Sequence, residues 1–338
     1  MKMNHILRNA CLPAMILLAA VSCTKTVDEG TNVAAKRYFD AWRAINYPSA
    51  VEKDGIYIIN DQPGTGKEWN ENLSVSFLTY TVRNLDGTVS TNNDEDWARQ
   101  LGTWNHTYYY GPQISFTGEG VSYAGVDNLL KGMRQGGTRT AILPSWMMTY
   151  NRYDSAKDYL EHETESSSAI YTVTFLDQTG SLPDYEYSML RDYAARNWNV
   201  IDTLSTAAVF FKSFTKFATP PAEMPKDTTV YINYTGRRVY DGQVFDTTIA
   251  DTAKVYDIYN PSKTYAPVPV TWAEEATSIL LNNNSIIDGF ANGLKAMHAG
   301  EKASFAFGYR LGYGSSASGN LIPAYAALQF DVELVPEP

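Results

Sequence analysis

The side chains that could do chemistry gather in the last third of the chain, where aromatic residues alternate with short polar motifs. In chain order these motifs read Tyr234-Thr235-Gly236, Asp241-Gly242-Gln243-Val244-Phe245-Asp246, Ile286-Ile287-Asp288-Gly289-Phe290, Gly293-Leu294-Lys295, Gly312-Tyr313-Gly314, Leu321-Ile322-Pro323 and Leu328-Gln329-Phe330-Asp331. A single aromatic residue is typical of a hydrophobic core, and a single Asp is typical of a turn. Together, the aromatic rings could line a dry cup that strips water from a polar group, a chemistry that needs no nucleophile.

Other chemistries have weak support in the sequence. The four histidines, His5, His106, His162 and His298, show no metal-ligand spacing and have no Cys partner. The glycines near Gly312 follow an expected strand but open no helix, so they do not form a phosphate-binding loop. The sequence therefore predicts neither a metal nor a cofactor.

The succession of motifs over about residues 208 to 335 resembles the FK506-binding-protein family of peptidyl-prolyl cis-trans isomerases. The resemblance implies a substrate pocket at ten positions: Tyr234, Phe245 and Phe330 in the wall, Phe290 at the floor, Ile286 and Ile287 at the rim, Tyr313 and Asp246 beside the substrate carbonyl, and Leu321 and Ile322 closing the pocket. It also implies that the Ile287 amide binds a ligand carbonyl.

Two features depart from the family pattern. The chain between Asp246 and Ile286 is much longer than in minimal family members, and this insertion is expected either to cover the pocket or to pad the surface. The insertion also lacks the Arg that often pairs with the pocket Asp, which leaves the charge partner of Asp246 open.

The reaction that the resemblance implies suits these residue types. The barrier to rotation about a planar peptide bond is ~18–20 kcal/mol, and X-Pro bonds isomerise unaided in tens to hundreds of seconds. The twisted transition state is less polar than the planar ground state, so water favours the planar form. An aromatic cup that excludes water binds the twisted form preferentially.

An earlier part of the chain looks like a diverged copy of the last part. Both copies contain an apolar strand, a strand with Tyr-Thr, an Asp-Gly turn, the pattern Leu-Lys-x-Met-x-x-Gly and a closing strand; the Asp-Gly turns are Asp86-Gly87 and Asp241-Gly242. The first copy keeps Tyr80, but Val89-Ser90 stands in place of Phe-Asp and Val126 takes the floor position. We expect it to have lost isomerase activity. Its Trp146, Met147 and Met148 fit either a core or a client-binding patch.

The N-terminus carries features of a bacterial lipoprotein signal. Lys2 and Arg8 precede a short apolar run, and Ala20-Val21-Ser22-Cys23 resembles a lipobox. The resemblance implies cleavage before Cys23 and a lipid on its thiol, which would anchor the protein in the cell envelope, on the outer membrane facing the periplasm or the cell surface. An ordinary signal peptide with an incidental Cys is the alternative.

Composition and length limit the class of partner and the number of domains. The formal net charge of −10 argues against nucleic acid as a partner, because such proteins need a basic surface. The length predicts more than one core. We expect an α+β protein with tandem FK506-binding-like domains, each an antiparallel sheet wrapped around a short helix. The expected boundaries are 1–22 (signal peptide), 23–54 (lipidated tether and N-terminal helix), 55–178 (degenerate domain), 179–206 (linker helix) and 207–338 (isomerase domain).

Three functions remain open at this point, and the third of them is a structural lipoprotein of an envelope complex. The first is a proline isomerase that assists the folding of proline-containing polypeptides outside the cytoplasm. The second is a non-catalytic lipoprotein that binds peptides or client proteins, which the degraded pocket of the first copy keeps possible.

Overall fold

The computed structural model describes residues 31–338 except 164–165, 205–206, 220, 222–223 and 225–226. The expected signal peptide and Cys23 therefore lie outside the described residues. Among the helices that are described, none has the length and apolar character needed to cross a bilayer.

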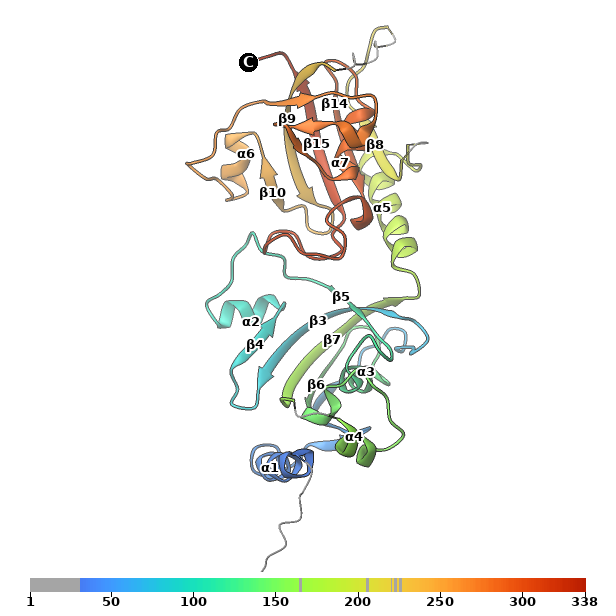
Figure 1. Ribbon diagram of the computed structural model, residues 1–338, viewed down its shortest axis with the longest axis vertical. Helices are drawn as coiled ribbons and strands as arrows, with labels where there is room; N and C mark the ends of the chain where they lie inside the picture. The colour runs from blue at the N-terminus through green and yellow to red at the C-terminus, as the bar shows by residue number, and fades with distance from the viewer. Residues whose placement is uncertain (1–30, 164–165, 205–206, 220, 222–223, 225–226) are drawn as a thin grey trace, which may run out of the picture.

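The molecule contains two antiparallel sheets, which lie one after the other along its long axis (Figure 1). We call residues 31–179 the N-terminal unit. Its strands are β1 (Val51–Lys53), β2 (Ile56–Gln62), β3 (Val75–Asn84), β4 (Val89–Asn92), β5 (Gln113–Phe116), β6 (Gly137–Leu143) and β7 (Ala169–Thr179), and its helices are α1 (Thr31–Asn46), α2 (Glu95–Gln100), α3 (Ala124–Leu130), η1 (Ser145–Met147) and α4 (Ala156–His162).

Residues 182–338 form the C-terminal unit. Its strands are β8 (Val209–Ser213), β9 (Thr229–Arg238), β10 (Val244–Thr247), β11 (Val268–Thr271), β12 (Leu280–Leu281), β13 (Asn284–Ser285), β14 (Lys302–Phe307) and β15 (Leu328–Val335), and its helices are α5 (Leu182–Trp198), α6 (Ala250–Val255), η2 (Ala276–Ser278), α7 (Asp288–Lys295) and η3 (Tyr309–Leu311). The predicted α+β class with antiparallel sheets is confirmed.

The two sheets share one strand order. The strand order is β2-β6-β7-β3 in the N-terminal unit and β8-β14-β15-β9 in the C-terminal unit. A hairpin strand (β4) and a returning strand (β5) pair with β3 in the first unit. Their counterparts in the second unit, β10 and β11, pair with β9. Helix α3 precedes β6 in the N-terminal unit, and helix α7 precedes β14 in the C-terminal unit. Each unit also places a short helix and a loop between its hairpin strand and its returning strand. The insertion after Asp246 is thus partly a feature of both copies.

The rest of that insertion belongs to the C-terminal sheet. Strands β11, β12 and β13 extend the sheet beyond β9, and Trp272 is buried in the core. Trp146 and Met147 of the N-terminal unit are also core residues, with 3% and 1% of their surface exposed. A client-binding patch at Trp146 and Met147 is therefore excluded.

Helix α5 joins the two units: its first turn packs on the N-terminal unit through Leu182 and Tyr185, and the rest of it packs on the C-terminal unit. Its buried residues Leu190, Ala194 and Trp198 lie in one cluster with Phe210 and Ala306 of strands β8 and β14. Ser181 caps the helix by accepting a hydrogen bond from the Asp184 N–H, and Asn199 ends it in the left-handed conformation. The helix is therefore part of the C-terminal core.

A buried carboxyl group ties α5 to η3. Glu186 is 6% exposed, and its Oε1 accepts a hydrogen bond of 2.9 Å from the Tyr309 N–H. A Cβ added at Gly308 would lie 2.1 Å from Glu186 Oε2, so the carboxyl group rests directly on the backbone. Burial raises the pKa of Glu186 to about 7, although the Tyr309 N–H and Arg310 oppose the shift.

This carboxyl group makes folding stability depend on pH. Because its pKa is higher in the folded chain than in the unfolded chain, the stability it contributes is complete below pH ~4.5 and is lost as the pH rises to about 7. We expect Glu186→Gln to keep the acceptor for Tyr309 and to abolish this loss, which is at most about 3 kcal/mol. Urea unfolding at pH 5 and pH 8 measures it. A pH dependence equal to that of the wild type in the variant would contradict this assignment.

Candidate functional site

The aromatic residues predicted for the pocket come together on one side of the C-terminal sheet. The rings of Phe290 and Phe330 stack with centroids 4.3 Å apart, and Tyr234 lies 5.6 Å from Phe290. Phe245 meets Phe330 edge to face at 5.8 Å. These elements are positioned by strand pairing, because β15 lies between β9 and β14, and by α7, which carries Phe290 over the sheet.

Phe245 reaches this cluster through an irregularity in its strand. The β10–β9 pairing jumps from Val244 opposite Arg237 to Asp246 opposite Gly236, so Phe245 is the extra residue of a bulge. A bulge redirects the side chain that it carries. A Cβ added at Gly236 would lie 2.7 Å from the Phe245 ring and 2.8 Å from the Phe330 ring. The absence of a side chain at Gly236 is therefore what makes room for both rings.

The polar groups stand beside this cluster. The Tyr234 hydroxyl donates a hydrogen bond of 2.6 Å to Asp246 Oδ2, and the Lys263 ammonium group pairs with Asp246 Oδ1. Burial raises the pKa of Tyr313, and the negative charge of Asp246 adds to the effect. Burial and Asp246 raise the pKa of Tyr234 strongly, so this hydroxyl remains a donor.

Lys263 was not among the residues predicted from the sequence. It occupies the role that an Arg was expected to fill, and it comes from the loop that follows α6. The sequence gives little indication that Lys263 pairs with Asp246, because Lys263 lies 17 positions after Asp246 in a segment without regular structure. The salt bridge is partly exposed, with 36% and 41% of the two side chains accessible.

The remaining predicted residues surround the aromatic cluster. Ile286, Ile287 and Leu321 are half-buried and pack against the same core, and Ile322 is buried within it. Ile287 is the residue before α7, so its N–H group lies outside the hydrogen bonds of the helix. Tyr313 is 40% exposed at the edge. The structure thus brings all ten predicted residues into one region.

The N-terminal unit lacks the corresponding cup. Strand register places Val82 opposite Tyr171, as Gly236 stands opposite Phe330. The extra residue of the matching bulge is Ser90, and Thr91 stands where Asp246 does. The sequence comparison, which set Val89-Ser90 against Phe-Asp, was therefore wrong by one residue. Ser90 and Thr91 follow Asp86 by four and five positions, as Phe245 and Asp246 follow Asp241.

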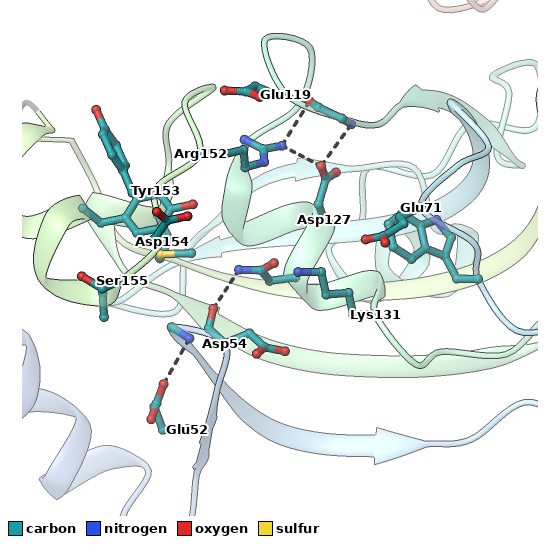
Figure 2. A pocket seen from close by; sticks show the side chains of 17 residues that line it. Glu52, Asp54, Glu71, Glu119, Asp127, Lys131, Arg152, Tyr153, Asp154 and Ser155 are labelled. Carbon is teal, nitrogen blue, oxygen red and sulfur yellow. Dashed lines mark hydrogen bonds and ion pairs between the residues drawn. The ribbon is translucent and has the colours of Figure 1, made fainter.

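A separate cavity of about 650 Å³ lies on the N-terminal unit (Figure 2). Its most buried acid, Asp127, accepts hydrogen bonds from the Arg152 guanidinium, from the Ser122 hydroxyl and from the Gly118 N–H, at 2.6, 2.5 and 3.0 Å. These contacts hold the loop of residues 118–122 against helix α3. Because its carboxylate is already paired, Asp127 has a structural role, and none of the ten predicted residues lines this cavity.

Comparisons with known proteins agree with the geometry. Residues 221–335 match the family described as FKBP-type peptidyl-prolyl cis-trans isomerase. FK506-binding protein 2 of Candida glabrata is 30% identical over 106 residues, which are 31% of this chain and 62% of that protein. The macrophage infectivity potentiator of Trypanosoma cruzi is 28% identical over 109 residues, 32% of this chain and 43% of that protein. The chain thus spans less than two thirds of either relative.

Solved structures of the same family are also similar in part. FkpA from Escherichia coli is 25% identical with a TM-score of 0.31, over 45% of this chain and 58% of that one. The three FKBP domains of wheat FKBP73 are 17% identical with a TM-score of 0.29, over 83% of this chain and 94% of that one. The aromatic cluster thus lies within residues 221–335, the part of the chain that is similar to the FKBP-type peptidyl-prolyl cis-trans isomerase family.

Proposed function

We propose that the C-terminal unit is a peptidyl-prolyl cis-trans isomerase that acts on proline-containing polypeptides. The observation that carries this proposal is the aromatic cluster of Tyr234, Phe245, Phe290 and Phe330, which lies beside a hydrogen-bonded carboxylate at Asp246. We call this cluster the cup. The match of residues 221–335 to the isomerase family supports it. The direct test is whether the full chain accelerates isomerisation of an X-Pro peptide in a protease-coupled assay.

The mechanism follows from desolvation. A proline ring that enters the cup leaves its planar imide among aromatic carbons, where the polar ground state loses the solvation that water gave it. The twisted transition state has less charge separation and loses less. Asp246 is held by Tyr234 and Lys263, so its charge is fixed in place beside the reacting carbonyl without any transfer of a proton.

We infer that the N-terminal unit does not catalyse. Val82 and Ser90 replace the Gly236 and Phe245 on which the cup depends. The alternative function for the whole chain is the binding of client peptides without catalysis, which the loss of the cup in one of its two units favours.

A change at Gly236 tests the cup directly. In Gly236→Ala the new methyl group would lie under 3 Å from both Phe245 and Phe330, so the rings must move. We expect kcat/KM for an X-Pro peptide to fall roughly tenfold or more, because displaced rings no longer enclose the imide and a loss of about 1.4 kcal/mol of transition-state stabilisation is already tenfold.

The matched control is Gly180→Ala, because a Cβ there meets only the flexible end of Leu73, at 3.3 Å. Both variants must first show cooperative thermal unfolding. Equal activity of Gly236→Ala and wild type would remove the cup from the mechanism.

The Tyr313 hydroxyl is expected to contribute modestly. Tyr313→Phe removes one hydroxyl from a side chain that is 40% exposed, so the fold should be unaffected. A neutral hydrogen bond is worth about 0.5–1.5 kcal/mol, which corresponds to at most about a tenfold loss of kcat/KM. Steady-state kinetics on one peptide measure the loss, and a decrease of a hundredfold or more would mean that Tyr313 does something other than donate one hydrogen bond.

We further propose that the protein is tethered to the bacterial cell envelope by a lipid on Cys23. This proposal is based on the sequence Ala20-Val21-Ser22-Cys23, which follows a short apolar run. Cys23→Ala should release the protein from membranes or stall its processing, because the thiol that receives the lipid is gone. Fractionation and incorporation of labelled palmitate measure this. If the variant is labelled and sediments with membranes as the wild type does, the tether lies elsewhere.

A further inference from the structure

Each unit carries a loop with the same local construction. We call residues 105–112 the first loop and residues 260–267 the second loop; each connects the short helix of its unit to the returning strand. Asn105 accepts from the Thr107 N–H at 3.0 Å, and its own N–H donates to the Tyr110 hydroxyl. The second loop repeats this at Asn260, Ser262 and Tyr265. The shared pattern is Asn-x-Ser/Thr-x-x-Tyr.

The two loops go to different places. The second loop remains on its own unit and delivers Lys263 to Asp246. The first loop crosses to the C-terminal unit, where the guanidinium of Arg238 receives it. Arg238 is 1% exposed, and its Nη1 donates to the Thr107 carbonyl at 3.1 Å and also to the Leu321 carbonyl.

The guanidinium group is itself held in place. Its Nε and Nη2 donate to the two carboxylate oxygens of Asp241 at 2.9 and 2.7 Å. This bidentate pair fixes the plane of the guanidinium, so the two N–H bonds of Nη1 point in set directions. One holds the N-terminal unit and the other holds Leu321, which closes the predicted pocket. A single buried side chain thus links the first loop to the pocket.

A second contact reaches the other flank of the pocket. His106 Nε2 lies 3.3 Å from Asp257 Oδ2, in the segment between α6 and the second loop. Tyr109 adds ring contacts, 5.5 Å from the Arg238 guanidinium and 6.2 Å from the Tyr240 ring. The first loop therefore reaches the segment with Leu321 through Arg238, and it contacts the segment that leads to Lys263 directly through His106.

We propose that the first loop of the N-terminal unit is a positioning element for the substrate pocket of the C-terminal unit, with Arg238 as the residue that transmits its position. This inference rests on the proposed isomerase function. If the Thr107 carbonyl moves away, a buried charged donor loses its partner, and the guanidinium must shift or hydrate. The Leu321 backbone, bound to the same nitrogen, then loses its fixed place.

The test is Asn105→Ala in the full chain, which removes the acceptor that shapes the first loop and leaves every pocket residue intact. We expect kcat/KM for an X-Pro peptide to fall about three- to tenfold, chiefly through KM, because the side of the pocket that binds the peptide is loosened. Asn105→Asp, which keeps a side-chain acceptor, should restore the wild-type value.

The matched control is Asn70→Ala. Asn70 shapes an equivalent turn by accepting from the Asn72 N–H at 3.0 Å, and its own N–H donates to Gln178 of the same unit. This control should leave kinetics unchanged. An equal loss in both variants, or no loss in Asn105→Ala, would overturn the proposal.

A measurement that needs no catalysis separates this proposal from the isomerase function. Ser318 and Ile322 exchange backbone hydrogen bonds across the pocket loop, at 2.9 and 3.3 Å. Hydrogen exchange at these two amides should be at least about tenfold faster in Asn105→Ala and unchanged in Asn70→Ala. Faster exchange in a chain without isomerase activity would reject the function and keep the positioning role. Unchanged exchange would reject the positioning role.

Discussion

The C-terminal unit depends on the close approach of helix α7 to the sheet beneath it. A Cβ added at Gly289 or Gly293 would lie 2.2 or 2.3 Å from the rings of Phe307 or Phe305, so a residue with any side chain would lift the helix. At this distance Phe290 lies flat on Phe330, with an interplanar angle of 13°. The position of Phe290 against Phe330 and the position of the rim at the start of α7 both follow from this one contact. Aromatic stacking of this kind adds about 0.5–1.5 kcal/mol to the hydrophobic term.

The N-terminal unit shows that the fold survives without the pocket. Both units keep the same strand order and the same bulge beside the Tyr-Thr strand. Val82 nevertheless fills the space that Gly236 leaves open, and Tyr171, whose pKa burial raises to about 12, stands at the position of Phe330. Backbone hydrogen bonds and core burial are thus sufficient for the sheet, whereas the cup needs particular residues at a few positions. This separation allows one copy to change its role while the other keeps the pocket.

The sequence could predict most of the pocket, because its members lie on strands and on one helix, where spacing determines which face a residue occupies. Tyr234, Phe290 and Phe330 are of this kind. Residues in loops were not predictable in this way: Lys263 depends on the turn at Asn260, and the contact of Arg238 with Thr107 depends on how two units dock. The equivalence of Ser90-Thr91 to Phe245-Asp246 was predictable, because both pairs follow their Asp-Gly turns at the same spacing. The repeated Asn-x-Ser/Thr-x-x-Tyr pattern was visible in the sequence and would have identified the two loops as equivalent.

The packing of α5 on the C-terminal unit also has a consequence for synthesis. Residues 182–198 leave the ribosome long before strand β14, which ends at Phe307 and supplies part of their binding surface. At ~5–20 residues per second the helix waits roughly 5–20 s for that strand. During this time Leu190 and Trp198 have no partner from β14, while the N-terminal unit can already fold around its own core. Until β14 is available, the chain therefore exposes the apolar face of α5, a state in which aggregation and chaperone binding compete with completion of the fold.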